Sequence, residues 1–257
     1  VVEADGLRPE SSSEQRRLRK ADTYGDGKLR AEEALRDGLA QDDSVSCRSV
    51  SLRLPDVIGP FDDTFRLWAY WHWLHAGPEE PPQVQETGKV KRKAEDLETV
   101  PLDPPLAFVF SGDVARFIVT FLDAKLPPET PRCDAVNLTC VQQLPLAEML
   151  TLLASASGLS CPPPLAPTKR PRTFLPSVDR PWLYSHHRAL EVYSFATTPL
   201  EDVLRICAAW FKEACSTFPQ EARRAAKKVP GSASKAALAS AGLEADGESS
   251  SSSSSSS

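Results

Sequence analysis

A short alternating segment that ends at a proline most strongly limits how this chain can fold. Residues Ser49–Leu54 alternate serine or arginine with valine and leucine, and Pro55 follows them. An alternating run bounded by a proline is typical of a half-buried β-strand. Asp56–Pro60 is then a predicted turn at the carboxyl end of this strand, the edge where ligands bind in open α/β sheets. The segment therefore predicts a strand with a candidate ligand site just beyond it.

A helix is predicted before that strand, and it carries a tyrosine and a lysine four residues apart. Apolar residues recur at helical spacing from about residue 24 to residue 39. Residues four apart are neighbours on a helix surface, so Tyr24 and Lys28 face the same side. A free tyrosine has a pKa of about 10, and a nearby ammonium favours the phenolate and lowers that pKa. Such a phenol can exchange a proton with an alcohol or a carbonyl while a nicotinamide exchanges the hydride.

The same spacing occurs by chance on many surface helices, so a solvated Tyr24–Lys28 pair is the alternative. Gly25 and Gly27 each cost about 1 kcal/mol relative to alanine in a helix interior. The helix is therefore expected to begin near Tyr24 and to become regular at Lys28.

The next predicted helix is unusually aromatic. Asp62–Thr64 offers an N-cap for a helix over Phe65–His75, which contains Trp68, Trp71 and Trp73. So many aromatic side chains in a few turns cannot all face one core, so some are expected to line a cleft or an interface. The alternative is a packing helix that happens to be rich in aromatic residues.

The remaining segments mix short strands, helices and loops. Strands are predicted at 106–110 and 135–138, and helices at 114–122, 146–156 and 200–215. Loops are predicted at 1–22, 77–105 and 161–181. From about residue 219 the chain is mostly alanine, lysine and serine and ends in a serine run, so it is expected to be disordered.

Charge argues against one class of protein. The net charge is −5 and the pI about 5.5, so a general nucleic-acid binder is not expected. Two short basic clusters, Lys89–Lys93 and Lys169–Arg172, could still contact RNA phosphates or act as a nuclear address. Solvated loop charge is the commoner explanation for such clusters.

Cysteine and hydropathy patterns indicate the compartment. The six cysteines form no CxxC pair and have no histidine at zinc-ligand spacing. The adjacent His186 and His187 have no third ligand nearby in the sequence, so no metal site is expected. Reduced thiols fit an intracellular protein. No apolar stretch approaches the ~20 residues of a membrane span, so no membrane partner is expected. Residues 1–5 resemble neither a signal nor a transit peptide. The cytoplasm is therefore the expected location, with an organelle left open.

Five segments match, in order, the motifs of one known family. Tyr24 and Lys28 match a YxxxK pair, and Val1–Pro9 looks like the acidic, proline-containing loop before it. The later matches are Leu52–Pro60 to LRxxNVYGP, Phe108–Ala115 to FVHVDDVA, Ala135–Leu138 with Pro145–Glu148 to YNLG…S/PLxEL, and Thr197–Phe211 to TSLEEGL…WF. From residue 1 to about 215, the chain thus resembles the extended short-chain dehydrogenase/reductase family, also called the NAD-dependent epimerase/dehydratase family.

The resemblance also has gaps. The family's glycine-rich phosphate loop and its catalytic serine or threonine lie upstream of the tyrosine, and neither has a counterpart here. Ser11, Ser12 and Ser13 lie in a charged loop and are not assigned that role. Asp56 replaces a frequent asparagine, and an ionised carboxylate only accepts hydrogen bonds. The first residue is also not methionine, so the chain is expected to be a C-terminal portion with little activity alone.

The resemblance implies an α/β fold, a partial Rossmann-type doubly wound parallel sheet with a smaller C-terminal substrate-binding portion. Residues 1–62 would belong to the dinucleotide-binding domain. Residues 63–218 would form the substrate-binding portion with returning sheet strands, and residues 219–257 the disordered tail.

The resemblance further implies roles for named residues. Tyr24 would be the general acid/base, and Lys28 would lower its pKa and hold the nicotinamide ribose. The remaining site residues would be Pro55, Asp56 and Val57 near the nicotinamide or the substrate, and Trp68, Trp71 and Trp73 as a wall of the substrate pocket. The cofactor would be NAD or NADP, the substrate a nucleotide sugar or similar hydroxylated molecule, and a further partner a second copy in a homodimer. The alternative is a non-catalytic scaffold of the same fold that binds protein or RNA.

Overall fold

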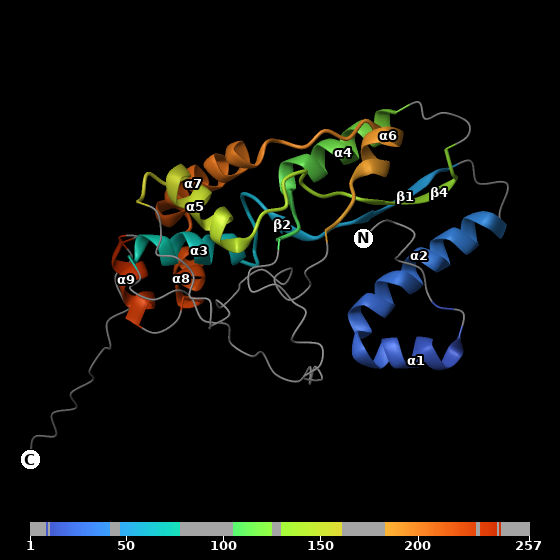
Figure 1. The fold of residues 1–257 in the computed structure, drawn as a ribbon, viewed down its shortest axis with the longest axis horizontal. Helices are drawn as coiled ribbons and strands as arrows, with labels where there is room; N and C mark the ends of the chain where they lie inside the picture. The colour runs from blue at the N-terminus through green and yellow to red at the C-terminus, as the bar shows by residue number, and fades with distance from the viewer. Residues whose placement is uncertain are drawn as a thin grey trace, which may run out of the picture.

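The computed structural model describes residues 9, 11–41, 47–77, 105–124, 130–160, 183–229, 232–240 and 242. Within these ranges the chain is a mixed α/β protein with parallel strand pairs and more helix than strand (Figure 1). The predicted fold class is therefore confirmed. The predicted division at residues 62 and 63 falls after the second strand and stays a prediction.

The described strands form two separate parallel pairs. β1 (Ser49–Arg53) lies beside β4 (Cys133–Asn137), with Ser51 opposite Ala135. β2 (Asp56–Ile58) lies beside β3 (Phe108–Phe110). The three predicted strands are confirmed to within two residues at each end. The turn predicted at 56–60 is wrong in its first half, because those residues pair with β3.

A helical core fills one end of the molecule (Figure 1). Its helices are α3 (Arg66–His75), α5 (Leu146–Ala156), α7 (Leu200–Thr217), α8 (Pro219–Lys227) and α9 (Ser232–Ser240). Aromatic side chains dominate the packing, and the Trp68 and Phe211 rings stack with centroids 5.6 Å apart. The predicted helices at 146–156 and 200–215 are confirmed.

The helices α8 and α9 correct the prediction of a disordered tail from residue 219. Ala222, Ala225, Ala226 and Ala237 are completely buried, and both helices pack on α3. Alanine has the highest intrinsic helix propensity, and its small side chain lets these helices lie close to the aromatic helix. The low hydrophobicity of this segment therefore does not make residues 219–227 and 232–240 disordered. The serine run itself lies outside the described residues.

A second, smaller core covers the β1–β4 pair. It is formed by α4 (Ser111–Asp123) and α6 (His187–Tyr193) together with Val136 and Leu138. Arg188 and Tyr193 attach α6 to β4, because both donate hydrogen bonds of 2.8 Å to Asp134. Burial and the hydrogen bond to the Asp134 carboxylate both raise the pKa of Tyr193, so this tyrosine stays a neutral donor.

Two helices near the N-terminus correct the loop predicted at residues 1–22. They are α1 (Ser12–Ala21) and α2 (Thr23–Gln41), which form a hairpin below the β1–β4 pair in Figure 1. Ser11 is the N-cap of α1 and accepts a hydrogen bond from the Glu14 amide at 3.4 Å, and Ser12 and Ser13 are the first residues of the helix. No residue of α1 is buried, and Leu39 is the buried residue of α2.

Candidate functional site

An aspartate fixes where α2 begins and so places Tyr24 in its first turn. Asp22 Oδ1 accepts a hydrogen bond of 2.8 Å from the Gly25 amide. This satisfies one of the amides that a helix start leaves without a partner. The helix is regular from Thr23, so the start expected near Tyr24 is confirmed and the delay expected until Lys28 is not found.

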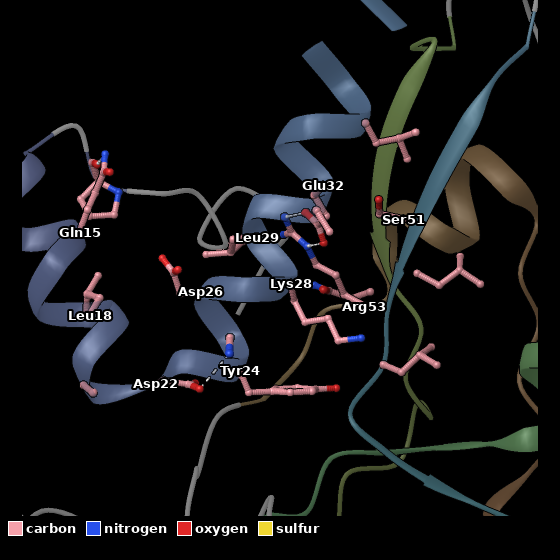
Figure 2. A pocket seen from close by; sticks show the side chains of 18 of the residues that line it. Gln15, Leu18, Asp22, Tyr24, Asp26, Lys28, Leu29, Glu32, Ser51 and Arg53 are labelled. Atoms are coloured by element: carbon pink, nitrogen blue, oxygen red, sulfur yellow. Dashed lines mark hydrogen bonds and ion pairs between the residues drawn. The ribbon is translucent and has the colours of Figure 1, made fainter. Parts of the chain in front are cut away.

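Tyr24 and Lys28 lie on one face of α2, and Figure 2 shows both side chains extending from the helix in the same direction. The Lys28 ammonium nitrogen lies 5.2 Å from the centroid of the Tyr24 ring. Tyr24 is 75% exposed, so its hydroxyl is open to a ligand. The sequence therefore correctly predicts that the two side chains meet.

Both residues line a cavity of about 780 Å³, here named the α2–β1 cavity. Its walls come from α1, α2, residues Ser51–Leu54, Asn137 and Tyr184. Arg53 and Asn137 are the last residues of β1 and β4. One end of the cavity therefore lies at the carboxyl edge of a parallel strand pair, where α/β proteins commonly bind ligands.

An ion pair that the sequence did not single out joins α2 to β1 inside this cavity. Arg53 donates two hydrogen bonds to Glu32, from Nε at 3.0 Å and from Nη2 at 2.6 Å. Glu32 follows Lys28 by four residues, so Tyr24, Lys28 and Glu32 form one stripe along the helix. The four-residue spacing from Lys28 was a signal that could have placed Glu32 on this face of α2, whereas its pairing with Arg53 depends on how α2 packs beside β1.

The structure does not bring the three predicted nicotinamide contacts into the cavity. Pro55, Asp56 and Val57 are absent from its lining. The buried Asp56 accepts a hydrogen bond of 3.1 Å from Arg66, and Val57 packs against the smaller core. Asp56 and Val57 pair with β3 beyond the lining residue Leu54, and the role predicted for the three residues near a cofactor or substrate stays a prediction.

The three tryptophans of α3 are also not where a substrate wall would require them. Trp68, Trp71 and Trp73 are 1%, 5% and 1% exposed and belong to the helical core. The aromatic side chains of α3 therefore pack in the core, as the alternative interpretation of this helix predicted. Helices on several sides of α3 let its aromatic side chains be buried in different directions, which the argument from a single core did not anticipate.

Other candidate groups do not assemble into a site. His187 pairs with Glu191 at 2.9 Å on the surface of α6. In the described ranges, no group of three or more histidine, cysteine or acidic side chains is arranged to hold a metal ion. The basic clusters at 89–93 and 169–172 lie outside the described residues. None of the helices that the structure describes is long and apolar enough to span a membrane.

Comparisons with known proteins give a likeness of fold. No family model and no curated protein sequence matches the chain. The Bordetella bronchiseptica enzyme WbmF, solved with NAD+ and UDP, matches with a TM-score of 0.50 and 16% identity over 80% of this chain and 57% of that one. The UDP-glucose 4-epimerase of Bifidobacterium longum, solved with NAD+ and UDP, matches with a TM-score of 0.49 and 17% identity. This match covers 77% of this chain and 56% of the epimerase. The UDP-glucose 4-epimerase of Thermotoga maritima, solved with UDP-glucose, matches with a TM-score of 0.49 and 16% identity. This match covers 74% of this chain and 53% of the epimerase.

The chain thus spans little more than half the length of these solved proteins. At this identity the likeness to WbmF shows the fold alone, a partial Rossmann-like α/β arrangement in which helices dominate.

Proposed function

We propose that this chain carries the proton-transfer pair and part of the ligand site of an NAD(P)-dependent enzyme of the extended short-chain dehydrogenase/reductase type. One observation carries the proposal: Tyr24 and Lys28 lie side by side and line the α2–β1 cavity, one end of which lies at the carboxyl edge of a parallel strand pair. A nucleotide sugar is the proposed substrate class. The presence of NAD+ and UDP in the structure of WbmF supports both ligand classes.

The described residues fit one part of such a cofactor. The Tyr24 hydroxyl and the Lys28 ammonium are exposed and can donate hydrogen bonds to ribose hydroxyls. Across the described ranges, no glycine-rich strand-to-helix turn is present to receive a pyrophosphate. When bound, a nicotinamide would supply or accept the hydride.

The proton chemistry would belong to Tyr24. Its phenol would take a proton from a substrate hydroxyl, or return one to a carbonyl oxygen, as a general acid/base. The ammonium of Lys28 would stabilise the phenolate through their mutual attraction. Glu32 and Arg53 would hold α2 so that both side chains face the cavity.

The test uses NADH and UDP as binding probes and UDP-glucose as the trial substrate. Tyr24→Phe should weaken NADH binding by no more than about tenfold, the contribution of one neutral hydrogen bond, and lower turnover by at least 10²-fold, because general acid/base catalysis typically contributes about that much. Lys28→Met should weaken NADH binding by about tenfold or more, since a hydrogen bond to a charged group contributes roughly 1.5–3 kcal/mol. Tyr193→Phe removes a hydroxyl outside the cavity and serves as the matched control.

Two outcomes would count against the proposal. Absence of saturable NADH and UDP binding would remove the cofactor and nucleotide-sugar assignment. Turnover unchanged by Tyr24→Phe would exclude this phenol as the proton carrier and favour the non-catalytic scaffold.

A further inference from the structure

Three aromatic side chains meet on the surface of the helical end of the molecule. Phe61, in the turn between β2 and α3, lies 5.4 Å from Trp210 of α7 and 6.1 Å from Phe218, the residue before α8, measured between ring centroids. Phe61 is 75% exposed, Phe218 is 38% exposed and Trp210 is half-buried. Ile206, one turn before Trp210 on α7, is 41% exposed and extends the same surface. We name these four residues the aromatic patch.

The backbone holds Phe61 in this exposed position at an energetic cost. Its φ is 63°, in the left-handed region that is unfavourable for a residue with a Cβ. Hydrogen bonds fix the turn, because the Asp62 amide donates to Gly59 O at 3.4 Å and Asp62 Oδ1 accepts from the Thr64 amide at 2.9 Å. The turn thus keeps a phenyl ring in water, where it gains little hydrophobic stabilisation. This combination points to a ligand that covers the ring.

A proline-rich segment of the same chain has the composition that such a patch binds. Residues 161–172 lie outside the described ranges, and their sequence contains five prolines, three cations and no acidic residue. Pro164 and Pro167 form a PxxP pair, and Lys169 follows two residues later. Segments of this kind bind as polyproline II helices to surfaces lined by aromatic side chains.

Charge favours this segment over an anionic ligand. Asp63 lies two residues after Phe61 and is exposed. Glu213, also exposed, lies one turn after Trp210 on α7. Carboxylates beside the patch attract the cations of residues 169–172 and repel the phosphates of a nucleic acid.

The segment also begins and ends close enough to reach the patch. It starts after Ser160, just beyond α5, and α5 packs against α7 (Figure 1). Twelve residues of polyproline II extend about 37 Å, whereas the 18 residues of α7 extend about 27 Å. Beyond the far end of the segment, Gln143 holds the backbone of Tyr184 through hydrogen bonds of 2.7 Å and 2.9 Å. Because the fold fixes both ends, the segment has a high effective concentration at the patch.

We propose that the aromatic patch binds residues 162–171 of the same chain as a polyproline II segment. Pro164 and Pro167 pack against the aromatic rings, and the cations that follow pair with the exposed carboxylates. The contact connects the helical end to the stretch of chain that leads to Tyr184 in the wall of the α2–β1 cavity. It does not depend on the proposed catalytic pair, so either proposal can fail alone.

The test is limited proteolysis of the full chain with trypsin, with the cleaved bonds identified by mass spectrometry. Binding should protect the Lys169–Arg170 bond. Phe61→Ala should speed its cleavage at least about tenfold, because an aromatic anchor carries much of the binding free energy of a contact. Leu122→Ala removes a side chain of α4 that is also 75% exposed, lies outside the patch and is the matched control. Cleavage within residues 89–93 should be equal in all variants and calibrates the protease.

The double variant Pro164→Ala, Pro167→Ala tests the other side of the contact. It should speed cleavage of the same bond by a similar factor, and adding Phe61→Ala should speed it no further, because all three changes remove one contact. Pro176→Ala, outside residues 162–171, is the matched control.

Two results would overturn the proposal. One is cleavage of the Lys169–Arg170 bond at the same rate in the wild type and in Phe61→Ala, which is the result expected if the patch binds a separate protein. The other is full additivity of the proline and phenylalanine changes, because the two sides would then act independently.

Discussion

The Glu32 carboxylate and the Arg53 guanidinium meet through two hydrogen bonds, one at 3.0 Å and one at 2.6 Å. The pair joins the middle of α2 to the last residue of β1, and both side chains are half-buried at 23% and 19% exposure. A two-point contact of this kind fixes the rotation of α2 about its own axis. Because Lys28 and Tyr24 lie one and two turns before Glu32 on the same face, the ion pair also sets the direction in which their side chains point.

Removing one member of this pair should destabilise the protein more than removing an exposed pair. Glu32→Gln is expected to lower the free energy of unfolding by about 2 kcal/mol, because it leaves a half-buried guanidinium with a weaker partner. Urea denaturation measures the change. Glu14→Gln is the control, since its pair with Arg17 is largely exposed and should contribute less than ~0.5 kcal/mol. Equal effects from the two variants would contradict this assignment.

The buried carboxylate of Asp113 should also stabilise the folded protein, because it joins α4 to the segment that leads into α7. Asp113 accepts hydrogen bonds from Thr198, at 2.8 Å from its amide and 2.6 Å from its hydroxyl, and also pairs with Arg116. Asp113→Asn is expected to cost about 2–3 kcal/mol, because an amide group would then face one of the Thr198 donors. Asp202→Asn, in an exposed pair with Arg205, is the matched control and should change stability by less than ~0.5 kcal/mol in urea.

Local spacing was enough to predict the candidate pair. A four-residue separation on a helix brings Tyr24 and Lys28 together whatever the rest of the chain does. Partners far apart in the sequence could not be predicted in this way. Asp113 lies in the first turn of α4, and its partner Thr198 comes 85 residues later in the sequence. The pairing of Glu32 with Arg53 likewise depends on how α2 packs beside β1.

Composition was a weaker guide than spacing. An alanine-rich segment has too few large apolar residues to fold alone, yet α8 and α9 form because α3 gives them an aromatic surface to cover. The same coverage contributes to the burial of the tryptophans, since α8 and α9 pack on α3 in addition to the predicted helix α7, which Trp68 and Trp71 contact. The apolar pattern of α3 shows that its residues are hydrophobic and cannot show how many neighbours surround them.

The buried His72 should make stability depend on pH. Burial between aromatic side chains lowers its pKa from 6.5 to about 4, with a further contribution from His75 and a partial offset from the backbone of Ala222. Below pH 6.5 the unfolded chain binds a proton that the folded chain does not, so stability falls as the pH drops toward 4 and is fully present above 6.5. This difference corresponds to about 3 kcal/mol.

Chemical denaturation of wild type and His72→Phe at several pH values between 4 and 7.5 measures this effect. Phenylalanine keeps the ring and cannot bind a proton, so the variant should lose less stability than the wild type as the pH falls. His187→Phe makes the same substitution on the exposed surface of α6 and is the control for the change of side chain. Parallel curves for wild type and His72→Phe would show that His72 does not titrate between the two states.

The packing of α8 on α3 leads to a prediction that composition alone would not make. Ala225 is completely buried, and its neighbour Arg224 on the same helix is exposed. Ala225→Leu should destabilise the protein by about 1–3 kcal/mol, because a larger side chain has no space in this close contact. Arg224→Leu introduces the same residue on the outer face and should change stability by less than ~0.5 kcal/mol. If the segment were disordered, the two variants would have indistinguishable free energies of unfolding.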